Sequence, residues 1–166
     1  MPRIRLPETL DRIRALLDGA AVPRVFLPLS APAYHPLDIA EALNVPLDNV
    51  ATALLADADG DRMMAIVPGD ARIDLSRLAA ALGARHVRLA GRGTVRGQEP
   101  TPLPAVVSGL PTLIDRSLLS RLYLFGSTGD PSWVLRLEPA ALQRVTNAMV
   151  GDIVRAAPGQ PAARGE

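Results

Sequence analysis

The stretch NVATALLADADGDRMMAIVPGDARIDLSRLAAALGARHVRLA, residues 49–90, decides the fold. Two strand-length apolar runs, 50–56 and 63–67, flank an Asp/Gly cluster, which is the pattern of a β-hairpin. Asp74 then precedes apolar residues at helical spacing that end at Gly83, where a helix C-terminus favours a left-handed residue. A last alternating run predicts another strand. The stretch therefore predicts a ββαβ unit.

The rest of the chain supplies further short strands and amphipathic helices around this unit. In order, the predicted elements are a helix capped by Thr9 and ended by Gly19, an edge strand at 22–29, a helix from 38 to 43 ended by Asn44, a strand at 112–114, a hairpin of 121–125 with 133–137, and a helix from 139 that continues through 148–154. These elements predict an α/β fold with a curved mixed, largely antiparallel sheet or partial barrel flanked by helices. Residues 1–155 are predicted to form one domain, and 156–166 a disordered tail or linker.

Composition excludes several classes of function. A net charge of +1 gives no general electrostatic case for nucleic-acid binding. The absence of cysteine excludes disulfides, thiol nucleophiles and thiolate metal sites. The N-terminus lacks an apolar signal core, and no apolar run is long enough to span a membrane, so a cytoplasmic protein without membrane contact is expected.

The sequence offers no convincing metal or cofactor site. Its two histidines, His35 and His86, are far apart and belong to no zinc-binding pattern. Asp57, Asp59 and Asp61 imitate the start of a calcium loop, but Pro68 stands where the bidentate glutamate would be. Phosphate-loop and nucleophile-elbow patterns are also missing. No metal and no cofactor are predicted.

The order of several motifs carries a family resemblance. An apolar strand, a D-x-D-G turn, A-I-V-P-G-D, D-L-x-x-L-A-x-A-L-G and V-x-L-A follow one another in the quoted stretch. Further on come GLPTLIDRSL at 109–118, GSTG at 126–129, LEPAAL at 137–142 and VGDI at 150–153. Together, over about 22–154, they resemble the YbaK family of aminoacyl-tRNA deacylases, whose fold also occurs as the editing insertion of bacterial prolyl-tRNA synthetases. The resemblance implies a pocket that takes the 3′ end of a misacylated tRNA.

The resemblance also implies which residues line that pocket. The family lysine of the first hairpin strand corresponds to Thr52, and no lysine occurs anywhere, because all 18 basic residues are arginine. Thr52 can form a hydrogen bond but carries no cation, and the fork of an arginine does not replace the lysine. In relatives, main-chain groups and the terminal ribose hydroxyl carry much of the chemistry. The substrate-binding residues implied by the resemblance are His35, Gly97, Pro102, Asp115, Gly126, Ser127 and Gly129.

Two functions remain open at this point. The chain is either a trans-editing deacylase that hydrolyses misacylated tRNA, or a catalytically inactive YbaK-like module that binds a ligand or tRNA. In either case an aminoacyl-tRNA synthetase or a fused domain is a conceivable partner. Thr52 is the residue that discriminates between the two functions.

Overall fold

The computed structural model describes residues 8–90, 103 and 109–155. Within these residues lie four α-helices: α1 (Glu8–Gly19), α2 (Pro36–Leu43), α3 (Leu75–Leu82) and α4 (Pro139–Thr146). The strands are β1 (Arg24–Pro28), β2 (Ala51–Ala58), β3 (Asp61–Pro68), β4 (Val87–Leu89), β5 (Thr112–Asp115), β6 (Leu124–Ser127), β7 (Trp133–Leu137) and β8 (Met149–Gly151), and the 3₁₀ turns are η1 (Leu47–Asn49) and η3 (Arg116–Ser120). The predicted tail, 156–166, lies outside the described residues, so the predicted domain boundary stays a prediction.

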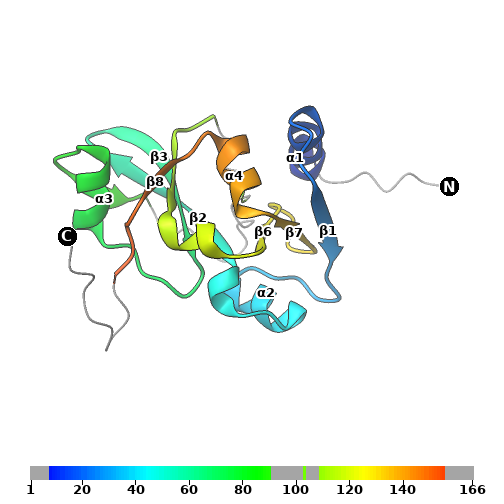
Figure 1. Cartoon of the computed structure of the whole chain (residues 1–166). Coiled ribbons are helices and arrows are strands. Elements are labelled where there is room, and N and C mark those ends of the chain that lie inside the picture. The colour runs from blue at the N-terminus through cyan, green and yellow to red at the C-terminus, as the bar shows by residue number, and fades with distance from the viewer. Residues whose placement is uncertain (1–7, 91–102, 104–108, 156–166) are drawn as a thin grey trace.

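The strands form two sheets that meet at the start of β2. The larger sheet has the order β4-β2-β3-β5-β8 and the smaller one β1-β7-β6. The hairpin pairings are antiparallel, whereas β3–β5 and β5–β8 are parallel. A single parallel bridge between Val50 and Phe125 joins the two sheets. Figure 1 shows α3 at one end of the molecule and α1 at the other, with the sheets between them. The predicted mixed, largely antiparallel and unclosed architecture is confirmed.

The ββαβ unit forms for the local reasons that its sequence indicated. Asp59 and Gly60, with φ of 51° and 92°, make the two-residue turn between Ala58 and Asp61, and left-handed backbone at both positions matches the twist of a hairpin. The Asp74 carboxylate accepts hydrogen bonds from the first main-chain N–H groups of α3, and Gly83 ends that helix at φ 64°. β4 then returns to pair with the far half of β2.

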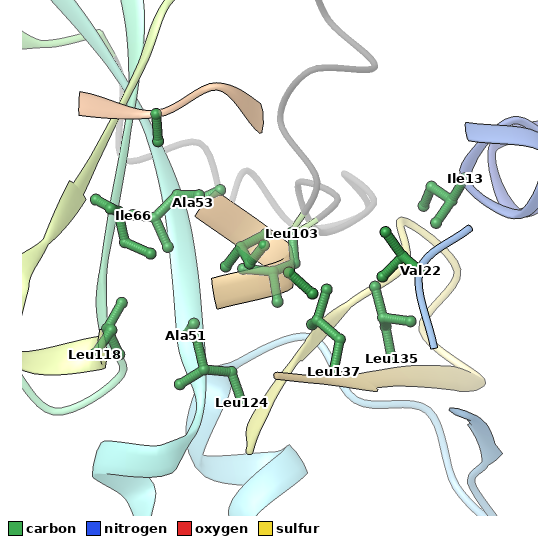
Figure 2. Close-up of a cluster of buried hydrophobic side chains, with 14 of the residues drawn as sticks. Ile13, Val22, Ala51, Ala53, Ile66, Leu103, Leu118, Leu124, Leu135 and Leu137 are labelled. Carbon is green, nitrogen blue, oxygen red and sulfur yellow. The ribbon is translucent and has the colours of Figure 1, made fainter. Parts of the chain in front are cut away.

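The β2–β3 hairpin separates two hydrophobic clusters, because alternate residues of a strand face opposite sides. Ala51 and Ala53 face the larger cluster, which includes residues of α1, β3, β6 and β7. Ala56 faces the other cluster, which contains Leu78 of α3. Figure 2 shows Leu103 among the labelled side chains of the larger cluster. Both clusters are aliphatic at their centres, as expected for a chain with only five aromatic residues.

The predicted helix at 148–154 is wrong. Asn147 ends α4 in the left-handed conformation, with φ of 50°. The chain then forms β8, which pairs in parallel with β5, and Val154 bridges Ile73. The edge of the buried strand β5 offers main-chain N–H and C=O groups that pair with a strand but not with a helix. This pairing overrides the helical sequence pattern of 148–154.

Smaller differences concern element ends and faces. The helix α1 already contains Glu8, so Thr9 is not its cap. Among the apolar residues of these helices, Ala42 of α2 and Leu75 of α3 are exposed, whereas Ala40 of α2 is buried. The strand predicted at 121–125 begins at Leu124 and runs through Ser127, because its first residues follow η3. No helix among the described residues combines the length and apolar character needed to cross a bilayer.

Candidate functional site

Thr52 lies near the start of β2, directly across from Val67 of β3. Its side chain is half-buried and its hydroxyl oxygen is fully buried, yet this oxygen has no hydrogen-bond partner among the described residues. Buried hydroxyls are nearly always paired, because an unpaired one forfeits its hydration without compensation. Among the described residues, the Thr52 hydroxyl is therefore a buried polar group whose hydrogen-bonding capacity is unused.

The beginning of α2 is held against this end of the hairpin by Gly69. The Gly69 N–H donates to the carbonyl of Val50 at 2.6 Å. A Cβ atom on Gly69 would lie 2.7 Å from Cβ of Pro36 and 3.2 Å from the Val50 carbonyl oxygen. Only a glycine lets the first turn of α2 approach so closely. The sequence contained this signal in the A-I-V-P-G-D motif, but its role was not predicted.

His35 immediately precedes α2, and its side chain is exposed. The carboxylate of Asp38 accepts hydrogen bonds from the main-chain N–H groups of Tyr34 and His35, both at 3.2 Å. These bonds fix the entry into α2, which begins at Pro36 rather than at Asp38. Through Pro36 and Gly69, the backbone of His35 is held near the same end of the hairpin as Thr52.

The end of β6 borders the start of β2 and carries the other predicted pocket residues. A Cβ atom on Gly126 would overlap Leu103, whose own N–H donates to the Ser127 carbonyl at 2.8 Å. The Ser127 hydroxyl accepts from the N–H of Gly129 at 3.0 Å, and Gly129 has φ of 86°. Gly126 therefore packs against Leu103, and Ser127 and Gly129 stabilise the turn that follows β6. Gly97 and Pro102 lie outside the described residues.

Asp115 ends β5 and is only 2% exposed. One carboxylate oxygen accepts from the Ile153 N–H at 2.9 Å. The other accepts from the Ser117 N–H at 3.1 Å and from the Ser117 hydroxyl. With these three donors the carboxylate caps η3 and anchors the chain after β8. The capping contact with Ser117 is local, whereas the contact with Ile153 joins residues that are remote in the chain and was not predicted.

The far end of the hairpin has a shallow depression of about 260 Å³, lined by Asp57, Asp59, Gly60, His86, Val87 and Arg88. The Asp59 carboxylate accepts from the N–H groups of Arg85 and His86, at 2.9 and 2.8 Å. These two hydrogen bonds, the one from Arg85 first, lower the pKa of Asp59 below its ordinary value. Asp57 lies roughly 16 Å along β2 from Thr52, at about 3.3 Å per residue. This depression is therefore remote from the predicted pocket.

Comparison with known proteins identifies the family. The family model of the aminoacyl-tRNA editing domain matches residues 30–145, well over half of the chain. The chain belongs to this family. The predicted resemblance is confirmed, and aminoacyl-tRNA editing by a deacylase-type activity on tRNA is the function that the family assignment supports.

Solved structures show the same fold in this editing domain. A hypothetical protein, APE2540, superposes with a TM-score of 0.77 at 23% identity, covering 87% of this chain and 99% of its own. A candidate trans-editing enzyme for prolyl-tRNA synthetase gives 0.72 at 21% identity, covering 91% and 99%. A candidate signal transduction protein from Marinobacter aquaeolei VT8 gives 0.69 at 21%, with 92% of this chain covering 31% of that one. No curated protein matches the sequence.

Proposed function

We propose that this editing domain hydrolyses the ester bond between a wrongly attached amino acid and the 3′-terminal ribose of tRNA. Water adds to the ester carbonyl carbon, the bond to the ribose oxygen breaks, and that oxygen takes up the proton. The observation that carries the proposal is the buried, unpartnered hydroxyl of Thr52 at the position of the family lysine. The family assignment supports the same reaction class.

The proposed role of Thr52 is to place the substrate by a hydrogen bond. Its hydroxyl can donate to the ester or ribose oxygens and accept from a ribose hydroxyl. Since this hydroxyl is already desolvated, it loses no further hydration when substrate binds. Substrate-assisted chemistry by the ribose hydroxyl and main-chain groups then requires no cation at residue 52. The start of α2 and the end of β6 are proposed to form the flanking walls.

The partner of this reaction is proposed by analogy. One structure with this fold is a candidate trans-editing enzyme for prolyl-tRNA synthetase, which makes tRNA for proline charged with a small amino acid the first substrate to assay. Association with a synthetase, or with a fused domain, is proposed as the way in which the free domain would meet its mischarged substrate. His35, Gly97, Pro102, Asp115, Gly126, Ser127 and Gly129 remain the proposed surroundings of the pocket.

The test is single-turnover deacylation by the wild type and by Thr52→Val, which keeps the branched shape and removes the hydroxyl. We expect hydrolysis to slow about tenfold to a hundredfold, which corresponds to the loss of one strong hydrogen bond of roughly 1.5–3 kcal/mol. Thermal stability should stay equal or rise, because an unpaired buried hydroxyl is replaced by a methyl group.

Thr146→Val is the matched control, because it makes the same chemical change on α4. The Thr146 hydroxyl donates to the Leu142 carbonyl at 2.8 Å, so this variant should lose stability and keep its activity. An active wild type whose Thr52→Val variant hydrolyses tRNA at the same rate would show that Thr52 is only a strand residue. A wild type with no hydrolysis on any mischarged tRNA would contradict the proposed reaction.

A further inference from the structure

Tyr123 and Arg136 form a stacked pair on the outer surface of the small sheet. The Arg136 guanidinium carbon lies 4.7 Å from the centre of the Tyr123 ring. Arg136 of β7 pairs with Val25 of β1 on one side and with Phe125 of β6 on the other. The side chains of these three residues therefore share one face of the sheet. Phe125 packs there with residues of α2 and η1. The pair therefore lies on the α2 side of the small sheet.

This surface is unusually exposed for its composition. Tyr123 is 37% exposed and its neighbour Leu122 is 79% exposed, in a chain whose described large apolar residues are mostly buried. Among the described residues no carboxylate lies within ion-pair distance of Arg136, whereas several other arginines are paired. The surface thus presents an aromatic ring together with an unneutralised cation.

Arg121 adds a second cation on the same side. Its guanidinium bonds Asp48 of η1 at 2.7 Å, which orients the fork. Its Nε is buried and has no hydrogen-bond partner among the described residues. The Arg121 side chain is 35% exposed and is oriented by Asp48, and a guanidinium fork held in this way suits an oxygen-rich anion such as phosphate.

The surface is continuous with the proposed site. Tyr123 precedes Ser127 by about 13 Å of extended chain at roughly 3.3 Å per residue. Phe125, between them, bridges Val50, which is close in sequence to Thr52. Stacked nucleotides rise about 3.4 Å each, so this span corresponds to about four nucleotides.

We propose that Tyr123, Arg136 and Arg121, here called the β6 platform, bind the single-stranded nucleotides that precede the 3′-terminal residue of tRNA. This inference rests on the proposed function, which places the terminal ribose beside Thr52. Aromatic rings and guanidinium planes stack on unpaired bases, and arginines pair with phosphates. Tyr123 supplies the stacking surface, Arg136 supplies a charge that is unpaired among the described residues, and Arg121 supplies a guanidinium oriented by Asp48.

The test measures the binding of fluorescently labelled tRNA that carries no amino acid. The result therefore does not depend on hydrolysis. We expect Arg136→Gln and Tyr123→Leu each to weaken binding about tenfold, while Tyr123→Phe, which keeps the ring, binds like the wild type. Arg62→Gln is the matched control, since Arg62 is an exposed arginine beside the hairpin turn and the variant has the same net charge as Arg136→Gln. The slope of log Kd against the logarithm of the salt concentration should decrease in magnitude by about one for Arg136→Gln and should stay unchanged for the other variants. Thermal unfolding checks that each variant is folded.

The outcomes separate this inference from the proposed function. Equal losses in Arg136→Gln and Arg62→Gln, or unchanged binding in Tyr123→Leu, would overturn the β6 platform even if the wild type deacylates tRNA. Platform-dependent tRNA binding by a wild type that hydrolyses no mischarged tRNA would support the platform and contradict the reaction. A change from dimer to monomer in Tyr123→Leu, with unchanged tRNA binding, would assign the surface to a second copy of the chain.

Discussion

The two ends of the β2–β3 hairpin use their polar groups in opposite ways. At the turn, Asp59 accepts from two main-chain N–H groups and Asp57 accepts from the N–H of Gly60. At the open end, the buried hydroxyl of Thr52 has no partner among the described residues. The turn has the depression, yet Asp59 uses its carboxylate to hold the segment that leads into β4, and Asp57 uses its own to close the turn. The comparison shows that the open end keeps hydrogen-bonding capacity that the two turn aspartates have already used, which is why the proposed site is placed at the open end.

The largest loss of stability and activity is expected from Gly69→Ala, which changes the open end of the hairpin. The new methyl group would meet Pro36 at 2.7 Å and the Val50 carbonyl oxygen at 3.2 Å, so α2 must move away from the hairpin. We expect the free energy of unfolding to fall by about 1–3 kcal/mol. The deacylation rate of the folded variant should fall by up to about a hundredfold, because a small displacement of the reacting groups slows a reaction strongly.

Denaturant unfolding and single-turnover hydrolysis measure these two effects. Gly19→Ala is the control, since a Cβ atom there meets nothing within 4 Å. Activity that is unchanged in a folded Gly69→Ala variant would mean that the position of α2 does not matter for the reaction.

Thr52→Lys sharpens the contrast by restoring the family cation. If the pocket beside residue 52 takes substrate, a charge-assisted bond of roughly 1.5–3 kcal/mol should accelerate hydrolysis of a tRNA charged with a small amino acid about tenfold to a hundredfold. The rate is measured under single turnover, with thermal unfolding as a check on folding. A stable variant with no gain, beside an inactive wild type, would indicate a binding module instead of an enzyme.

The smallest effect is expected at the turn, where Asp59→Asn should change the acid stability and not the activity. Hydrogen bonds from Arg85 and His86 lower the pKa of Asp59 in the folded state. Its carboxylate therefore stabilises the fold above the unfolded pKa of about 3.9, and this contribution is lost as the pH falls through the lower folded pKa. Asparagine still tolerates the left-handed backbone of residue 59.

Melting temperature recorded against pH tests this expectation. The variant should be less stable than the wild type at neutral pH, and the two should converge below about pH 4. Asp61→Asn is the control, because no hydrogen bond to its carboxylate occurs among the described residues. Parallel curves for wild type and Asp59→Asn over the whole acid range would contradict the assignment.

The fold could be predicted wherever short-range chemistry decides it. Asp59-Gly60 sets the hairpin, Asp74 caps α3 and Gly83 ends it, and each acts on residues only a few positions away. The prediction failed at 148–154, where the deciding partner is β5, far away in the chain. A local sequence pattern does not reveal the edge of β5, because that edge exists only after the rest of the sheet has assembled.

The candidate site was predictable to a smaller extent. The motif order nominated Thr52, and the pairing of β2 with β3 places this residue opposite Val67, but its role in a pocket stays a prediction. The resemblance also nominated Asp115. Two of its three hydrogen-bond donors belong to Ser117, two residues further on, but the third is the Ile153 N–H, which no local pattern indicates. The close contact of Gly69 with Pro36 was likewise hidden, because it joins a turn to a helix that precedes it.

The strand β8 has a consequence for the synthesis of the chain. The N–H of Asp74, which caps α3, donates to the Ile153 carbonyl, and the N–H of Arg155 donates to the Arg72 carbonyl. The chain emerges from the ribosome with its N-terminal part first, so the edge of β5 stays open until residues 149–155 have been translated. The nascent domain therefore passes through an interval in which a strand that is fully buried in the folded domain lacks its parallel neighbour, and an unpaired strand edge of this kind promotes aggregation.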